Sequence, residues 1–290
     1  MERRLGVTGV GTDAVLPALG TKELVAALPM LLGLGTDSRV IVPELAYPTY
    51  DIGARVVGAQ VTASDSTMAI GPGRVDLVWV NSPANPTGRV LPAEHLRKVV
   101  DWARERGAIV VSDECYIELG WEAQPVSVLH PDVCGRSLQG VLALHSLSKR
   151  SNLAGYRAGF AAGDAALVSV LLEARKHLGL MMPAPVQAAM VAALDDDVHV
   201  VVQRQLYAAR RQVLLAALRG AGFSVEHSEA GLYLWVTRDE ACMDTVDWFA
   251  DRGILVAPGD FYGLRGARHV RVALTASDEH VDAAAGRIGR

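Results

Sequence analysis

One polar stretch in the middle of the chain carries residue types that together suit covalent chemistry at a carbonyl group. Ser146 and Lys149 follow an apolar run over residues 141–144, and Arg157 comes eight residues after the lysine. A lysine held among hydroxyls and beside a second cation can lose its proton, so that its amine becomes a nucleophile toward a carbonyl carbon. The stretch therefore predicts a Schiff-base lysine in an anion-binding pocket.

Other polar residues stand where predicted strands end. Asn85 lies in the loop over residues 81–88, whose prolines, glycine and asparagines indicate a rigid turn. Asp113 and Tyr116 follow a strand predicted over residues 108–112, close enough together to face one ligand. Ligands in open α/β sheets bind at the carboxyl ends of strands, which groups these residues with the lysine. Standing alone, the Asp113 motif would favour a helix cap and a packing tyrosine.

A third polar segment begins the first long helix, which is predicted over residues 24–34. Gly20, Thr21 and Lys22 precede it. A helix N-terminus offers free N–H groups and the positive end of the helix dipole, which suits a phosphate group. The same pattern is also typical of an ordinary helix start.

Two tyrosines, Tyr47 and Tyr50, flank Pro48 in a turn predicted after the strand over residues 39–43. Tyrosines in such a place usually pack against the core. A ring held at the carboxyl end of a strand can instead stack on a flat heteroaromatic ligand.

The elements that must position these residues alternate between strand and helix patterns in the first half of the chain. Strands are predicted over residues 39–43, 75–80, 108–112, 141–144 and 158–161, with an amphipathic helix over 92–106. This alternation favours a mostly parallel α/β sheet.

The second half has a different order of predicted helices and strands. Three helices are predicted over residues 164–178, 184–195 and 198–219, followed by short strands over 223–225, 233–236, 254–256 and 269–274 and by helices over 244–251 and from 277. We expect a large domain over residues 1–205 and a smaller α+β domain over residues 206–290, with the boundary inside the long helix.

Composition excludes several classes of protein. The net charge of −4 and the lack of a long basic run argue against a nucleic-acid surface. No apolar run is long enough for a membrane span, and the N-terminus lacks a secretory signal pattern. The three scattered cysteines fit neither a disulfide framework nor a metal site. We expect a cytoplasmic protein.

Taken together, the motifs resemble the fold type I, class I/II aminotransferases, which use pyridoxal 5′-phosphate (PLP). The matching segments are Asn85-Pro86-Thr87-Gly88, Asp113 with Tyr116, and Ser146-x-x-Lys149 with Arg157. The resemblance runs from residue 5 over essentially the whole chain, and it implies an aspartate aminotransferase-like fold. The local amino-acid sequence around these motifs is most similar to that of actinobacterial succinyldiaminopimelate transaminases.

The resemblance implies a role for each matching residue. Lys149 would form the Schiff base with PLP and later carry the transferred proton. Asp113 would pair with the pyridinium nitrogen, and Tyr116 and Asn85 would hydrogen-bond the 3-oxygen of the ring. The phosphate would be held by Gly20, by the backbone groups of Thr21 and Lys22, and by Ser146 and Arg157, and Tyr47 would stack on the ring.

The substrate would be held by Arg271 and Asn85, with Arg271 as the clamp for the α-carboxylate. The resemblance implies N-succinyl-L,L-diaminopimelate as amino donor, 2-oxoglutarate as acceptor and a role in lysine biosynthesis. A distal carboxylate would need a second cation, for which Lys22 and Arg150 are the candidates. It also implies a homodimer and a longer N-terminal segment than this chain has, so cofactor binding is better supported than turnover.

Three other functions are compatible with parts of the pattern. A different aminotransferase, or a PLP-dependent C–S lyase or decarboxylase on the same fold, would share the cofactor residues. A truncated relative would bind PLP with little turnover. A PLP-binding transcription regulator would carry a winged-helix DNA-binding domain, which this sequence does not show.

Overall fold

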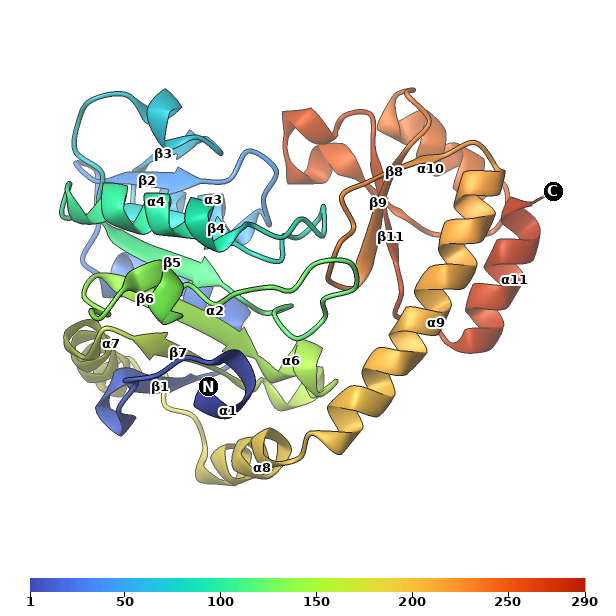
Figure 1. Cartoon of the computed structure of the whole chain (residues 1–290). Helices are drawn as coiled ribbons and strands as arrows, with labels where there is room; N and C mark the ends of the chain where they lie inside the picture. Colours follow the sequence, from blue (N-terminus) through green and yellow to red (C-terminus); the bar gives the residue numbers. More distant parts are fainter. Residues whose placement is uncertain (290) are drawn as a thin grey trace.

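A seven-stranded sheet forms the centre of the larger part of the molecule (Figure 1). The structure, a computed structural model, describes residues 1–289. The strand order is β1-β7-β6-β5-β4-β2-β3. The five strands from β6 to β3 are parallel, whereas β7 runs antiparallel to both β6 and β1. The strands are β1 (Val15–Ala18), β2 (Arg39–Val42), β3 (Gln60–Ala63), β4 (Leu77–Asn81), β5 (Ile109–Asp113), β6 (Val141–Ser146) and β7 (Gly159–Gly163). The predicted α/β class with a mostly parallel sheet is confirmed.

Helices cover both faces of this sheet. Successive strand residues point to opposite faces, so the apolar strands present hydrophobic side chains to both faces. Leu77 and Trp79 pack on one side, and Val78 and Val80 on the other. The first side is covered by α2 (Thr21–Leu31), α3 (Thr49–Val56) and α7 (Ala165–His177), and the second by α1 (Glu2–Leu5), α4 (Ala93–Arg104) and α5 (Pro131–Cys134).

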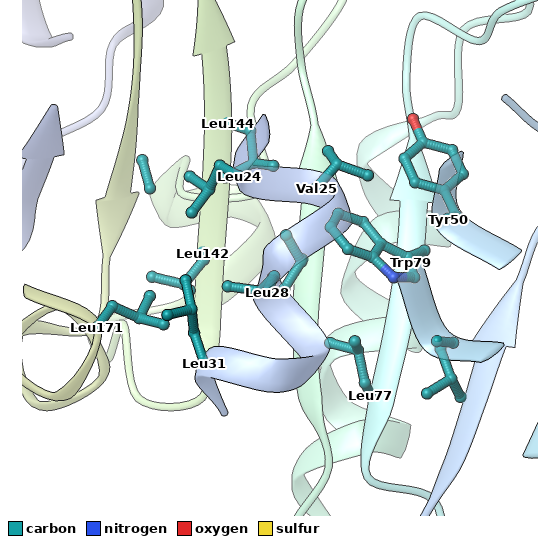
Figure 2. Close-up of a cluster of buried hydrophobic side chains, with 14 of the residues drawn as sticks. Leu24, Val25, Leu28, Leu31, Tyr50, Leu77, Trp79, Leu142, Leu144 and Leu171 are labelled. Carbon is teal, nitrogen blue, oxygen red and sulfur yellow. The ribbon is translucent and has the colours of Figure 1, made fainter. Parts of the chain in front are cut away.

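Figure 2 shows how α2 is anchored on the first side. Leu24, Leu28 and Leu31 lie on one face of the helix and pack toward Leu142 and other strand residues. Complete burial of each leucine side chain stabilises the fold by about 2 kcal/mol. This packing fixes the N-terminus of α2 at the carboxyl ends of the strands.

A second, four-stranded antiparallel sheet stands beside the first, with the order β10-β11-β9-β8. Its strands are β8 (Ser224–Glu226), β9 (Tyr233–Thr237), β10 (Ala257–Pro258) and β11 (Val270–Ala273). The helices of this half are α8 (Ala184–Asp195), α9 (Val198–Gly220), α10 (Cys242–Ala250) and α11 (Asp278–Ile288). In Figure 1, α9 runs from the edge of the large sheet to the second sheet and lies beside α11. The predicted boundary near residue 205 falls inside α9, and the division into two domains remains a prediction.

Strands β1 and β3 were not predicted, and two further segments differ from the sequence-based expectations. The predicted strand over residues 254–256 is absent, because Gly253 ends α10 in the left-handed conformation and the Ile254 N–H bonds back to the Phe249 carbonyl. The predicted turn at Tyr47 and Tyr50 runs directly into α3, whose pattern the sequence reading did not recognise.

The rigid loop after β4 connects the two sheets through its main chain. Ser228 N donates to the Thr87 carbonyl at 2.9 Å, and Ala230 N donates to the Gly88 carbonyl at 3.0 Å. A Cβ on Gly88 would lie 2.5 Å from the Ala230 oxygen, and its φ is +68°. Glycine is therefore required where the second sheet meets the loop. Within residues 1–289, no helix has the length and apolar character needed to cross a bilayer.

Candidate active site

A cavity of about 340 Å³ opens where the large sheet faces the second sheet. Asn81, Asp113 and Ser146 are the last residues of β4, β5 and β6, so three adjacent strands deliver polar side chains to one edge. In Figure 1 the arrowheads of β5 and β6 point toward the side on which the second sheet stands. Ten of the predicted site residues line the cavity, namely Thr21, Lys22, Tyr47, Asn85, Asp113, Tyr116, Ser146, Lys149, Arg157 and Arg271.

The start of α2 and Arg157 form an anion-binding corner. The first N–H groups of a helix have no partner within the helix, and no side chain caps α2. A Cβ on Gly20 would lie 2.4 Å from Nη2 of Arg157, and Gly20 has φ +81°. Arg157 itself is left-handed at φ +53°, a conformation that is rare outside glycine and concentrates at functional sites. Positive charge and free N–H groups therefore converge here, which suits a phosphate.

Asp113 is held as a buried carboxylate with two hydrogen bonds. Tyr50 donates its hydroxyl hydrogen to Oδ2 at 2.7 Å, and the Cys115 N–H donates to Oδ1 at 3.1 Å. Burial and the neighbouring carboxylate raise the pKa of Tyr50 well above its usual value, so its hydroxyl remains a donor. The carboxylate orientation is fixed while it still lines the cavity.

Asn85 and Arg271 meet across the cavity from different sheets. Arg271 Nη1 donates to Asn85 Oδ1 at 2.9 Å, while the Asn85 main-chain N–H donates to Asn81 Oδ1 at 2.7 Å. The Arg271 guanidinium also lies over the Tyr233 ring, 3.8 Å from its centroid. The Asn85 amide nitrogen is left to donate to a ligand, and the Arg271 guanidinium keeps donors for a carboxylate.

Lys149 lies in α6 (Leu147–Arg150), directly after β6. Its Nζ is 5.8 Å from the centroid of the Tyr116 ring. Within residues 1–289, no carboxylate lies within ion-pair distance of this amine. Lys22 also lines the cavity, with Nζ 5.5 Å from the centroid of the Tyr47 ring. The cavity thus holds an amine, a carboxylate and two aromatic rings around a space where a planar ligand can lie.

Arg150 does not belong to this site, contrary to one sequence-based expectation. Its side chain is buried, with Nε 2.9 Å from Glu118 Oε1 and Nη2 3.1 Å from Asp197 Oδ1. Two carboxylates already neutralise the guanidinium, so it is not free to pair with a substrate carboxylate. Of the two candidate cations, only Lys22 lines the cavity.

The structure adds site residues that the sequence reading did not select. Tyr50 was interpreted only together with Tyr47, and Tyr233 and Cys115 were assigned no role. All three line the cavity. Tyr50 is the second residue of α3, whereas Tyr47 lies in the turn before it, so recognition of α3 would have separated the roles of the two tyrosines. Burial raises the pKa of the Cys115 thiol well above its usual value, which keeps it protonated and inert.

Comparison with known proteins gives consistent matches over almost the whole chain. The family model "Aminotransferase class I and II" matches residues 4–288. A probable aminotransferase of Mycobacterium tuberculosis is 63% identical over 288 residues, which are 99% of this chain and 69% of the relative. A 4-dedimethylamino-4-oxo-anhydrotetracycline transaminase of Streptomyces rimosus is 59% identical over 99% of this chain and 80% of its own length. The solved structure of a probable N-succinyldiaminopimelate aminotransferase from Thermus thermophilus has a TM-score of 0.88 at 28% identity, and covers 99% of this chain and 80% of that one.

Proposed function

The chain belongs to the class I and II aminotransferases and shares their fold, and on that premise we propose which residues perform its transamination and on which substrates. Enzymes of this family use PLP. The roles follow from the cavity in which Lys149, Asp113 and the Gly20–Arg157 corner face one space.

The residues present fit PLP. The cofactor carries a phosphate, a ring nitrogen, a 3-oxygen and an aldehyde, and each has a matching group in the cavity. The Arg157 guanidinium fills the space that a Cβ on Gly20 would take. Arg157 and Gly20 together form a corner that suits the phosphate. Asp113 suits a protonated ring nitrogen, because its carboxyl group is buried and already oriented by two hydrogen bonds.

When bound, PLP supplies an aldehyde that takes up an amino group and a ring that stabilises negative charge at the substrate carbon. Lys149 would provide the amine that binds the aldehyde and would afterwards move the substrate's α-proton through its Nζ. Tyr116 and Asn85 would donate hydrogen bonds to the 3-oxygen, Tyr47 would cover the ring, and Ser146 would support the phosphate.

Arg271 binds the substrate α-carboxylate. The guanidinium is oriented by Asn85 and by the Tyr233 ring, so its free N–H groups can meet a carboxylate in bidentate geometry. The arrangement favours α-amino acids as donors.

For the substrate pair, we propose N-succinyl-L,L-diaminopimelate as donor and 2-oxoglutarate as acceptor. Both carry a carboxylate far from the reacting carbon, and Lys22 is the cation available for it. The likeness to the Thermus thermophilus protein, a probable N-succinyldiaminopimelate aminotransferase, supports this pair. A buried carboxylate without a partner would cost several kcal/mol, so we expect Lys22 to matter most for dicarboxylate substrates.

The test is a single-turnover screen that follows the cofactor absorbance after mixing the holoenzyme with one amino donor. Succinyldiaminopimelate and glutamate should convert the cofactor faster than alanine or an aromatic amino acid. A Lys22→Met variant should lose most of that preference, while its reaction with alanine changes little. Faster conversion by alanine or an aromatic donor would contradict the proposed substrate pair but would leave transamination intact.

A second acceptor belongs in the same screen, because the Streptomyces rimosus relative is a 4-dedimethylamino-4-oxo-anhydrotetracycline transaminase at 59% identity. The cofactor is first loaded with an amino group, and then 2-oxoglutarate or a polycyclic aromatic ketone is added. We expect 2-oxoglutarate to restore the starting absorbance faster. Faster restoration by the ketone would indicate that the acceptor substrate is a polycyclic ketone of a biosynthetic tailoring reaction.

A further inference from the structure

Two tyrosine hydroxyls meet at the boundary between the two sheets, inside the proposed site. Tyr116 follows β5 in the large sheet, and Tyr233 is the first residue of β9 in the second sheet. Their hydroxyl oxygens are 3.0 Å apart, and the rings meet edge to face with centroids 5.7 Å apart. Both side chains are buried and both line the cavity.

The direction of this hydrogen bond follows from the number of hydrogens available. Each hydroxyl has one hydrogen to donate, and within residues 1–289 neither has another hydrogen-bond partner. A hydrogen donated from Tyr116 to Tyr233 would leave only lone pairs of Tyr116 facing the cavity. A hydrogen donated from Tyr233 to Tyr116 leaves the Tyr116 hydrogen free for an acceptor in the cavity. The second direction alone suits a ligand with an anionic oxygen.

We propose that Tyr233 is a positioning residue, whose hydroxyl donates to Tyr116 and thereby directs the Tyr116 hydrogen toward the 3-oxygen of PLP. The inference rests on the proposed function of Tyr116. A donor that itself accepts a hydrogen bond is polarised and donates more strongly, so Tyr233 also strengthens the contact.

The surroundings of the pair support this role. Burial, and next the neighbouring tyrosine, raise the pKa of Tyr116 well above its usual value, so its phenol keeps its hydrogen at neutral pH. Asp113, Cys115 and Lys149 face Tyr116 from the large sheet, and Arg271 and Tyr262 face Tyr233 from the second sheet. None of these groups hydrogen-bonds either hydroxyl among the described residues.

Tyr233 has two separable contacts, which makes a clean test possible. Its ring supports Arg271 at 3.8 Å, and its hydroxyl meets Tyr116. Tyr233→Phe keeps the ring and removes only the hydroxyl. Tyr262→Phe is the matched control, because the Tyr262 ring also lies near Arg271, at 5.1 Å, while its hydroxyl does not contact Tyr116.

The experiment titrates the absorbance of the PLP-bound protein with pH. A hydrogen bond donated to the 3-oxygen stabilises its negative charge and lowers the pKa of a proton shared by that oxygen. Tyr233→Phe should therefore raise the pKa of the bound cofactor by about half a pH unit, and Tyr262→Phe should not change it. In a Tyr116→Phe background, adding Tyr233→Phe should give no further shift, and the KM for the amino donor should stay unchanged in the single variant.

Three results would overturn the proposal. They are an unchanged cofactor pKa in Tyr233→Phe, a shift that persists in the Tyr116→Phe background, and loss of PLP binding by Tyr233→Phe, which would indicate a structural requirement instead. Failure of the proposed function is distinguishable, because the unmodified protein would then show no Lys149-bound cofactor to titrate.

Discussion

At the scale of one residue, Asp113 shows how the fold orients a buried carboxyl group toward the ligand cavity. Its two oxygens receive hydrogen bonds from Tyr50 and from the Cys115 main chain, and the side chain is only 7% exposed. A carboxylate held in a fixed orientation is what a protonated ring nitrogen requires, so Tyr50 supports the proposed chemistry without contacting the substrate.

Replacing Asp113 should therefore affect the reaction more than cofactor retention. Asp113→Asn keeps the size of the side chain and loses the charge, so we expect the half-reaction rate to fall by about a hundredfold or more. The phosphate corner is untouched, and the Kd for PLP should change far less. Stopped-flow absorbance and a PLP titration measure the two quantities. Equal losses in both would show that Asp113 is structural.

Tyr50→Phe is a milder substitution that affects the same carboxylate. It removes one hydrogen bond to a charged group, which is worth about 1.5–3 kcal/mol. We expect about a tenfold slower half-reaction, with the same products and the same substrate preference. A Tyr50→Phe protein as fast as the unmodified one would remove Tyr50 from the account.

At the scale of the elements, adjacent strands bury an acid and a base outside the cavity of the site. Glu114 follows β5, and His145 is the penultimate residue of β6. Glu114 Oε2 lies 3.5 Å from His145 Nε2, and neither atom has a hydrogen bond in the described chain. Burial raises the pKa of Glu114 to about 7 and lowers the pKa of His145 to about 3. Both groups are therefore neutral in the fold at moderately acidic pH.

This pair makes stability depend on pH in two opposite ways. The folded state holds the Glu114 proton more tightly than the unfolded state does, so its contribution is lost as pH rises from about 4.5 to about 7. For His145 the unfolded state binds the proton more tightly, so stability is lost as pH falls from about 6.5 to about 3. Between pH 4.5 and 6.5 the two slopes cancel.

Glu114→Gln should remove one of the two slopes. Relative to the unmodified protein, the variant should gain about 3 kcal/mol of unfolding free energy between pH 4.5 and pH 7.5. Urea unfolding at these two pH values measures the difference. Glu105→Gln, at an exposed carboxylate, is the control. A difference between variant and unmodified protein that stays constant with pH would show that Glu114 is not the group that titrates.

The elements also show which parts of the fold could be predicted from the sequence. Strands β4, β5 and β6 were predictable because each is a buried apolar run that ends in polar residues. The short strands β1 and β3 and the helix α3 lack that contrast. Motif residues such as Lys149 and Asp113 line one cavity, because strand ends in a parallel sheet share an edge, and their roles remain predictions. Tyr50 and Tyr233 depend on contacts across 63 and 117 residues, which local patterns do not record.

At the scale of the whole molecule, the site exists only because two sheets meet. Lys149, Asp113 and the phosphate corner belong to the large sheet, whereas Arg271 and Tyr233 belong to the second sheet. Main-chain hydrogen bonds join Thr87 and Gly88 to the connection between β8 and β9. The second sheet would thus hold the substrate α-carboxylate through Arg271, and the large sheet would hold the cofactor. The homodimer implied by the family resemblance remains a prediction.

The measurement that tests the central claim most directly is covalent trapping of PLP. The holoenzyme is reduced with borohydride and digested, and the modified peptide is identified by mass spectrometry. The label should lie on Lys149, and a Lys149→Ala protein should carry none. The other lysines are Lys22, Lys98 and Lys176, of which Lys22 lines the same cavity and is the sharpest competitor. A label on Lys22 or on any other lysine, or a protein that cannot be labelled, would contradict the account.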